Sequence, residues 1–170
     1  QSQTCEKHLE NADAYIRKGN YAAAIESYTA AIKLDPQSAY VYTNRGIAYL
    51  NTNQIDLAIQ DFTQVIHLDP KDKNAYGLRG IAYRSKNEYG LSLKDLDMDI
   101  SLDPKDASSL YYRSLLHYSM GEYEKAASDC KILMTLSPDN GDFYFDLIGP
   151  LIRLRRLEEA WDVYKKFKES

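Results

Sequence analysis

The chain has 170 residues, of which 44% are hydrophobic and 27% charged, and its formal net charge at pH 7 is -4. These values are typical of a soluble globular chain, and no apolar run approaches the roughly 20 residues that a membrane-spanning helix needs. The negative net charge argues against a nucleic-acid-binding protein, because such a surface needs a basic face that neutralises phosphates.

Prolines mark a repeat along the whole chain. They stand 34 residues apart, and three of them belong to the same tripeptide Leu-Asp-Pro: Pro36, Pro70, Pro104 and Pro138. A fixed period of about 34 residues indicates stacked helix-turn-helix units, each too small to bury its apolar face alone. Counting from two residues after each proline, we predict five repeats at approximately 5–38, 39–72, 73–106, 107–140 and 141–170.

Each repeat is predicted to contain two amphipathic helices with a turn between them. In the second repeat, apolar residues follow a helical spacing first over 42–49 and again over 58–66. The turn column holds residues that tolerate the left-handed conformation at a helix end: Gly19, Asn53, Asn87 and Gly121. Because Gly46 and Gly80 fall inside predicted first helices, we expect a close helix approach at both positions.

The third repeat carries an acidic run, Asp95-Leu96-Asp97-Met98-Asp99. It lacks the Gly and the distal Glu of a calcium loop, so we predict no metal site there. Asp99 stands in the column that holds Ala31 and Val65 in earlier repeats, and a buried carboxylate needs a partner. We therefore expect Asp99 to form an ion pair or hydrogen bond with a fourth-repeat residue, in the first place Arg113.

The fifth repeat departs from the others. Pro150 falls inside its first helix, where a missing hydrogen bond should kink or split the helix. We interpret this as a degenerate capping unit, or alternatively as a functional kink. In its second helix, Trp161, Tyr164 and Phe167 form an apolar stripe, which predicts an end interface for self-association or docking.

The residues in register resemble those of the tetratricopeptide repeat (TPR) family over essentially the whole chain. The second repeat shows the pattern best, with six residues in the slots expected for that family: Tyr42, Gly46, Tyr49, Ala58, Phe62 and Pro70. The resemblance implies an all-α fold, a right-handed α-solenoid of stacked antiparallel helix pairs, and a single TPR domain over residues 1–170.

The resemblance also implies a concave groove, lined by the first helices, that holds an extended peptide or a helix of a partner protein. Its slots are occupied here by mostly apolar and tyrosine side chains: Leu9, Tyr40, Asn44, Ile47, Leu78, Ile81, Arg84, Tyr111, Tyr112, Leu115 and Tyr118, with Phe145 and Arg153 from the fifth repeat. Ile47 and Ile81 stand where the family commonly has Asn. Exposed apolar and aromatic side chains mark interaction sites, so we predict a groove suited to apolar anchors.

TPR proteins that bind the acidic tails of Hsp70 and Hsp90 use a five-residue clamp of Lys, Asn, Asn, Lys and Arg. Here only Asn44 matches, while Leu9, Asp13 and Leu78 stand in other slots. Such tails are therefore disfavoured as ligands, because the charge-assisted hydrogen bonds would be missing. We predict a non-enzymatic protein–protein interaction module, and as the alternative a scaffold that acts through the ends of the solenoid.

No sequence motif indicates catalysis. The three histidines, His8, His67 and His117, occupy different columns, and we expect no cofactor, no metal and no enzyme activity in this chain. His117 replaces a column tyrosine and is predicted to be a packed core residue. Cys5 and Cys130 should lie too far apart for a disulfide, and free thiols favour the cytoplasm over an exported location. The sequence leaves the localisation and the identity of the partner open.

Overall fold

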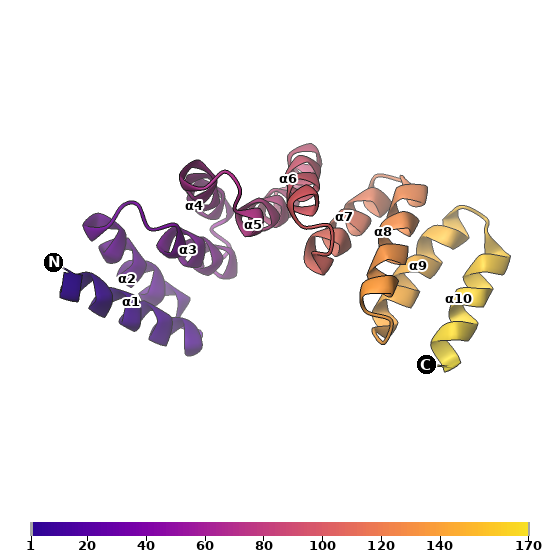
Figure 1. Cartoon of the computed structure of the whole chain (residues 1–170), viewed down its shortest axis with the longest axis horizontal. Coiled ribbons are helices and arrows are strands. Elements are labelled where there is room, and N and C mark those ends of the chain that lie inside the picture. The colour runs from indigo at the N-terminus through magenta and orange to yellow at the C-terminus, as the bar shows by residue number, and fades with distance from the viewer. Residues whose placement is uncertain (1, 170) are drawn as a thin grey trace. The chain divides into compact units, whose positions relative to one another are not determined.

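The computed structural model describes residues 2–169, and these residues form ten α-helices joined by short turns (Figure 1). The helices are α1 (Ser2–Arg17), α2 (Tyr21–Leu34), α3 (Ala39–Asn51), α4 (Ile55–Leu68), α5 (Lys73–Ser85), α6 (Tyr89–Leu102), α7 (Ala107–Ser119), α8 (Tyr123–Leu136), α9 (Gly141–Arg153) and α10 (Leu157–Glu169). Helices α3, α5, α7 and α9 begin at the predicted first residues of repeats two to five. The predicted helix pairs are confirmed.

The Leu-Asp-Pro segments end one helix and prepare the next. The side chains of Asp69 and Asp103 each accept a hydrogen bond from the backbone two residues later, at 2.9 Å and 3.1 Å. A second aspartate then caps the following helix: Asp72 accepts from Ala75 N at 3.0 Å, and Asp106 does the same for α7. The proline between the two aspartates cannot continue the preceding helix, so each repeat boundary is fixed locally.

The turn inside each repeat has a left-handed residue at the predicted column. Asn53 and Asn87 have φ angles of 58° and 60°, and Gly19 and Gly121 have 69° and 78°. Repeat five uses Arg155, at 59°, in the same column. The prediction that this column ends the first helix in the left-handed region is confirmed.

The chain divides into two compact units, residues 1–95 and 96–170, and the boundary falls inside α6. In the first unit, apolar residues of α1, α2 and α3 form one core cluster: Ala12, Ala24, Tyr28, Ala31 and Val41. In the second unit, α8, α9 and α10 form another: Ala127, Cys130, Tyr144, Leu147, Leu151, Ala160 and Val163. The single domain over residues 1–170 stays a prediction.

Close helix approach explains Gly46. A Cβ atom there would lie 2.6 Å from Phe62 Cε1, and Phe62 is fully buried on α4. At Gly80 the carbonyl accepts a 2.6 Å hydrogen bond from Ser92 Oγ on α6. Both glycines therefore lie where a second helix comes close, as predicted.

Helix α9 is not split at Pro150, and that part of the sequence prediction is wrong. The helix runs without interruption from Gly141 to Arg153 and has Pro150 inside it. Pro150 stands in the last turn, where its fixed φ suits a helix and where only one backbone donor is lost. Among residues 2–169, no helix has both the length and the apolar character required to cross a membrane.

Candidate protein-binding surfaces

A repeated arginine–aspartate pair is the main polar feature of the helix packing. Arg45 donates two hydrogen bonds to Asp61, from Nε at 2.8 Å and from Nη2 at 2.7 Å. Arg79 and Arg113 make the same paired contact with Asp95 and Asp129. In each case an arginine of a first helix binds an aspartate of the second helix in its own repeat.

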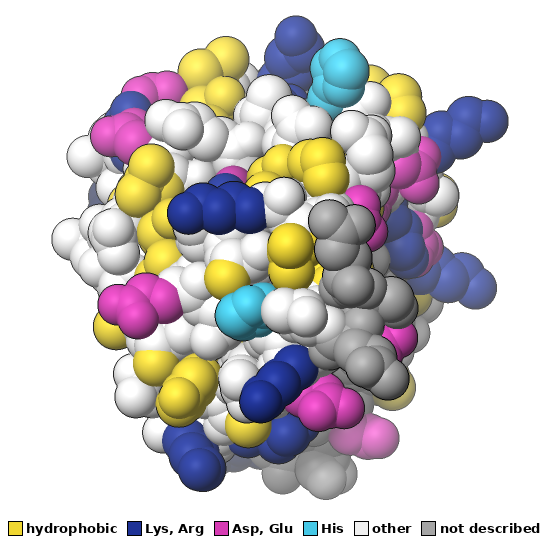
Figure 2. Space-filling view, turned by 90° about the vertical axis from the view of Figure 1, so that its left-hand side faces the viewer, with side chains coloured by type: hydrophobic (Ala, Val, Ile, Leu, Met, Phe, Trp, Pro, Cys, Tyr) yellow, Lys and Arg dark blue, Asp and Glu magenta, His cyan; other side chains and the backbone are white. Residues whose placement is uncertain are grey.

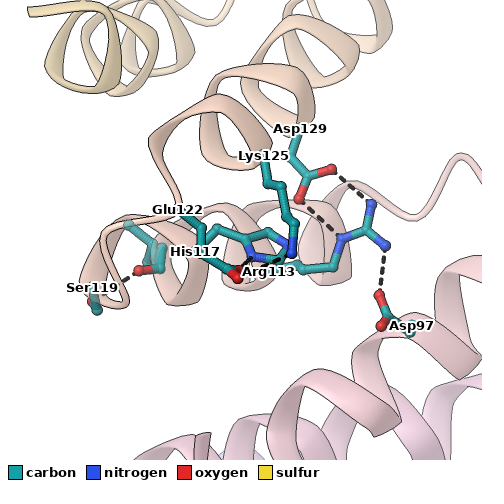
Figure 3. A network of polar contacts seen from close by, with 8 residues as sticks. Asp97, Arg113, His117, Ser119, Glu122, Lys125 and Asp129 are labelled. Carbon is teal, nitrogen blue, oxygen red and sulfur yellow. Dashed lines mark hydrogen bonds and ion pairs between the residues drawn. The ribbon is translucent and has the colours of Figure 1, made fainter. Parts of the chain in front are cut away.

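The third nitrogen of each arginine reaches the preceding repeat. Nη1 of Arg45 donates to Thr29 Oγ1 at 3.0 Å, and Nη1 of Arg79 donates to Thr63 Oγ1 at 3.1 Å. Arg113 Nη1 instead pairs with Asp97 at 2.7 Å (Figure 3). We call these three arginines with their aspartates the Arg–Asp pairs. Their contacts are structural, and their signal in the sequence was the same period of 34 residues.

Repeat five replaces the pair with apolar residues. Leu147 stands in the arginine slot and Val163 in the aspartate slot, and both are buried in the core of the second unit. The same junction is therefore built once from hydrophobic packing and three times from ion pairs. This substitution offers an internal template for replacing a pair.

Asp99 is buried, as predicted, but Arg113 is not its partner. The hydroxyl of Ser109 on α7 donates a hydrogen bond to Asp99. Arg113 is already held by Asp129 and Asp97, so its guanidinium cannot turn toward Asp99. The prediction of a partner in repeat four is confirmed, and the choice of Arg113 is wrong.

The titratable groups described show structural roles. His117 is buried, as predicted, and its Nδ1 lies 2.6 Å from Glu122 Oε2 (Figure 3). Lys125, and after it His117, lowers the pKa of Glu122. Cys5 and Cys130 are free thiols. Within residues 2–169, no three His, Cys, Asp or Glu side chains are grouped so that they could hold a metal ion.

In the first unit, the predicted groove residues lie on α1, α3 and α5. Tyr40 is the most exposed of them, at 53%, and its hydroxyl donates to Asp13 at 3.0 Å. The Tyr28 hydroxyl also donates to Asp13, at 2.7 Å. Burial, followed by the hydrogen bond to Asp13, raises the pKa of both tyrosines, so both hydroxyls stay protonated. Asp13 is thus occupied by tyrosines, which sequence reasoning did not predict.

The other first-unit groove residues are half-buried: Leu9, Asn44, Ile47, Leu78, Ile81 and Arg84. Leu9 packs against the core cluster of this unit. The Asn44 amide donates to the Tyr40 carbonyl of its own helix at 2.8 Å. Helices α3 and α5 contact each other, which brings Ile47 and Ile81 onto neighbouring helices. The result is a surface of partly exposed aliphatic side chains.

In the second unit, the groove slots of α7 and α9 are aromatic. The rings of Tyr111 and Tyr112 meet edge to face at 5.6 Å. Tyr118 accepts a hydrogen bond from Arg153 Nε at 3.4 Å. Phe145 is 52% exposed, whereas Leu115 and the three tyrosines are half-buried. Asp146 occupies the slot that holds Asn44, Leu78 and Tyr112 in earlier repeats, and sequence reasoning missed it although that column was available.

A third candidate surface lies on α9 and α10. Trp161 and Leu157 are 59% and 62% exposed, and Trp161 stacks on Tyr164 with ring centroids 5.4 Å apart. With Ile148 and Ile152 they line an open depression of about 450 Å³. Phe167, predicted to share this stripe, points to another face of α10, where it contacts Tyr144 and Phe145. We call the depression the α9–α10 end surface.

Family models match the first part of the chain. A TPR repeat model matches residues 12–53, and a tetratricopeptide repeat model matches residues 39–72. No curated protein matches the chain significantly.

Solved structures match nearly the whole chain. A crystal structure of MamA protein has a TM-score of 0.91 at 24% identity, covering 99% of this chain and 92% of that one. MamA from residue 41 to its end, from Desulfovibrio magneticus RS-1, gives 0.90 at 19%, covering 98% and 94%. A tetratricopeptide repeat protein from Parabacteroides merdae ATCC 43184 gives 0.86 at 19%, covering 97% and 66%. At these identities, the similarity shows the fold alone. Together with the helix pairs that begin at the predicted residues, the matches identify the chain as a tetratricopeptide repeat protein with an all-α solenoid fold.

Proposed function

The TPR fold is a protein-interaction module, because its stacked helices present extended surfaces to a partner. We propose that this chain binds an extended or helical segment of another protein on the exposed face of its first helices. The observation that carries the proposal is the chemistry of that face. Aliphatic residues such as Ile47 and Ile81 are only half-buried, and Tyr40 and Phe145 are more than half exposed. Apolar and aromatic side chains that remain accessible are typical anchors of binding sites.

The polar groups of the face support ligands with apolar anchors. Asp13 is engaged by Tyr28 and Tyr40, and the Asn44 amide is bonded to its own helix. An acidic peptide tail would therefore meet a carboxylate and aliphatic side chains. Aromatic and aliphatic anchors would instead bury area that is now in water, at about 25 cal/mol per Å².

A selection from a displayed library of 15-residue peptides tests this proposal, because it needs no identified partner. The variant Ile47→Asp/Ile81→Asp places two charges on the first-helix face. The matched control Leu57→Asp/Leu91→Asp places two charges, also 34 residues apart, on exposed positions of the second helices α4 and α6. Both variants must first show the same melting behaviour.

We expect selected peptides to carry apolar anchors and to bind the first-helix variant at least about tenfold more weakly, which corresponds to about 1.4 kcal/mol. The control should bind as the original chain does. Peptides that bind the first-helix variant normally and lose the control would place the site on the second helices and overturn the proposal.

A second candidate function is self-association through the α9–α10 end surface. In repeat one the corresponding second-helix surface is covered, because Tyr28 packs in one cluster with Val41 of the next first helix. Tyr164, in the column of Tyr28, remains half-buried beside exposed Trp161 and Leu157. An apolar surface of this kind favours a covering helix.

The charges of α10 favour a second copy as that covering element. Its N-terminal half is acidic, with Glu158 and Asp162, and its C-terminal half is basic, with Lys165, Lys166 and Lys168. Two such helices packed antiparallel about a twofold axis would bring the acidic half of one beside the basic half of the other. The opposite end offers no such surface, because α1 exposes polar residues and charged side chains of both signs are spread over that face (Figure 2).

Sedimentation velocity between 1 and 200 μM tests the second candidate, with concentrations chosen to span weak dimerisation. We expect the original chain to shift toward a dimer as its concentration rises, and Trp161→Glu to remain monomeric. The control Phe145→Glu alters an equally exposed aromatic residue on another face of the second unit and should dimerise normally. A monomer at every concentration would remove this candidate.

A further inference from the structure

Repeat five contains a pocket where the preceding repeats have a side chain. The slot that holds Ile47, Ile81 and Leu115 holds Gly149 in α9. A Cβ on Gly149 would lie 3.6 Å from Tyr118 Cε2, which is an ordinary contact, so the site has room for a side chain. The space beside Gly149 is a cavity of about 180 Å³ between α7, α8 and α9. It lies on the first-helix face of the second unit.

The floor of this pocket is apolar and uncharged. It is formed by Ala126 and Cys130 of α8 and by Pro150 of α9, all three buried, with Leu115 beside them. Burial raises the pKa of the Cys130 thiol to about 11, so the thiol stays neutral at physiological pH. Apolar cavities of about 150 Å³ accept a molecule the size of benzene. The pocket is therefore large enough for a long aliphatic stem.

A single carboxylate lines the same pocket. Asp146 is half-buried, and the contacts of residues 2–169 give it no hydrogen bond and no ion pair. Its acidic neighbour is Asp142, one helical turn earlier; burial first, and then Asp142, raises the pKa of Asp146. A carboxylate in this setting gains from a cationic partner, because desolvation and a like charge both disfavour its ionised form.

The helix backbone adds a second acceptor at the same residue. Pro150 has no N–H, so the carbonyl of Asp146, four residues earlier, lacks its regular helical donor. Tyr118 and Phe145 contribute aromatic rings to the lining. Ring faces attract ammonium and guanidinium groups within about 6 Å. An aliphatic floor, aromatic rings and two oxygen acceptors together match a long side chain that ends in a cation.

We propose that this pocket, which we call the Asp146 pocket, binds a lysine or arginine side chain of the partner protein. The aliphatic stem lies against Ala126, Cys130 and Pro150, and the charged head group donates hydrogen bonds to the carboxylate and carbonyl of Asp146. The proposal rests on the proposed function for its location, because the side chain belongs to a segment bound along the first helices. It adds a chemical requirement, one basic residue among apolar anchors.

One positive group faces the pocket already. Arg153 on α9 places its Nε 3.4 Å from the Tyr118 hydroxyl and is exposed to solvent. It makes no contact with Asp146 among those described. Its charge opposes an incoming cation, so removing it should strengthen binding. This gives the proposal a variant whose predicted effect is a gain.

The first experiment uses small probes and the full chain. Nα-acetyl-lysine methylamide, its arginine counterpart and the norleucine counterpart are titrated while amide chemical shifts are followed by NMR. Norleucine has the same stem as lysine without the charge. We expect the lysine and arginine probes to shift the amides of Asp146 and Gly149 and to bind at least tenfold more tightly than the norleucine probe. Equal binding of the three probes would overturn the proposal.

Variants separate the charge from the shape of the pocket. Asp146→Asn keeps the shape and should weaken the cationic probes at least tenfold, leaving the norleucine probe unchanged. Gly149→Ile restores the side chain of the other repeats and should remove binding of all three. Arg153→Ala should tighten the cationic probes a few-fold, and Asp142→Asn, the matched control, should change them less than Asp146→Asn does. Unchanged binding to Asp146→Asn, in a variant that melts normally, would refute the role of this carboxylate.

The probes also distinguish failure of the pocket proposal from failure of the proposed function. If the cationic probes bind at Asp146 but displayed peptides ignore the first-helix face, the pocket stands and the proposed function fails. If displayed peptides bind that face without a basic residue, and the probes do not bind at Asp146, the proposed function stands and the pocket proposal fails.

Discussion

Replacing one Arg–Asp pair by its counterpart from repeat five should separate the cost of an unpaired charge from the value of the pair. The perturbation is Arg45→Leu/Asp61→Val, together with the two single variants. Leu147 and Val163 show that the same slots accept this apolar combination. Replacing a buried ion pair by packed apolar residues is often close to neutral, whereas removing one partner destabilises strongly.

The structure sets the size of the effect. The side chains of Arg45 and Asp61 are only 15% and 6% exposed, and two charge-assisted hydrogen bonds join them. Either single variant leaves the other charge in this site, which should lower the free energy of unfolding by about 3 kcal/mol. For a chain of this size, that equals a fall in Tm of about 6–12 °C. The double variant loses the bond to Thr29 but buries two apolar side chains, so it should stay within about 1 kcal/mol of the original.

Urea denaturation of the four proteins, followed by circular dichroism, gives the coupling energy of the pair. We expect about 3 kcal/mol or more, because the two single losses should not add. The control cycle uses Lys86 and Asp56, an exposed pair at 2.7 Å, for which the coupling should be close to zero. Additive single losses at Arg45 and Asp61 would refute the reasoning, since they would mean that neither charge needs the other.

Three further predictions concern single sites. Gly46→Ala should destabilise by about 1–3 kcal/mol in urea denaturation, because the new methyl would lie 2.6 Å from a ring carbon of Phe62; Gly90→Ala, with no atom within 4 Å, should be neutral or slightly stabilising, and equal losses would contradict the packing argument. Cys130, whose pKa burial raises to about 11, should resist iodoacetamide at pH 8 in the native protein and react in urea, as peptide mass spectrometry would show; rapid native labelling would contradict its burial. Asp146→Asn should raise the Tm slightly at pH 7, by less than about 1 kcal/mol in stability after solvent screening. The folded-state pKa of Asp146 is raised, so its ionisation disfavours folding above that pKa, and the gain should vanish below about pH 3.9, where the carboxyl is protonated in both states; a loss of stability at pH 7 would contradict the sign.

The repeat boundaries were predictable from the sequence because they depend on local chemistry. Proline, the two aspartates around it and the left-handed residue at Asn53 or Asn87 act within a few residues, so their period is visible in the printed chain. The arrangement of side chains between helices was less accessible. The acidic run of α6 drew attention to Asp99, and only the fold shows that Ser109 reaches it while Arg113 turns to Asp129.

The candidate surfaces were predicted only in outline. Columns identified the slots of Ile47 and Tyr40 but gave no sign that Asp13 would be occupied by two tyrosine hydroxyls. Nor did they indicate a pocket at Gly149, since a cavity arises from the side chains of three helices at once. The direction of Phe167 was missed for a related reason, because a stripe drawn on one helix ignores the neighbour that covers part of it.

The change from Arg–Asp pairs to an apolar junction in repeat five affects how the chain opens. Hydrogen-exchange protection of a helix reflects the free energy of its local unfolding, and stacked repeats open at the junction that is easiest to break. Junctions held by Arg45 and Arg79 should lose protection in concentrated salt, whereas the packing around Leu147 should not, because salt screens charges but strengthens apolar burial. Ionic strength would then shift the site of first opening along the chain, with α9 and α10 frayed at low salt and comparatively protected at high salt.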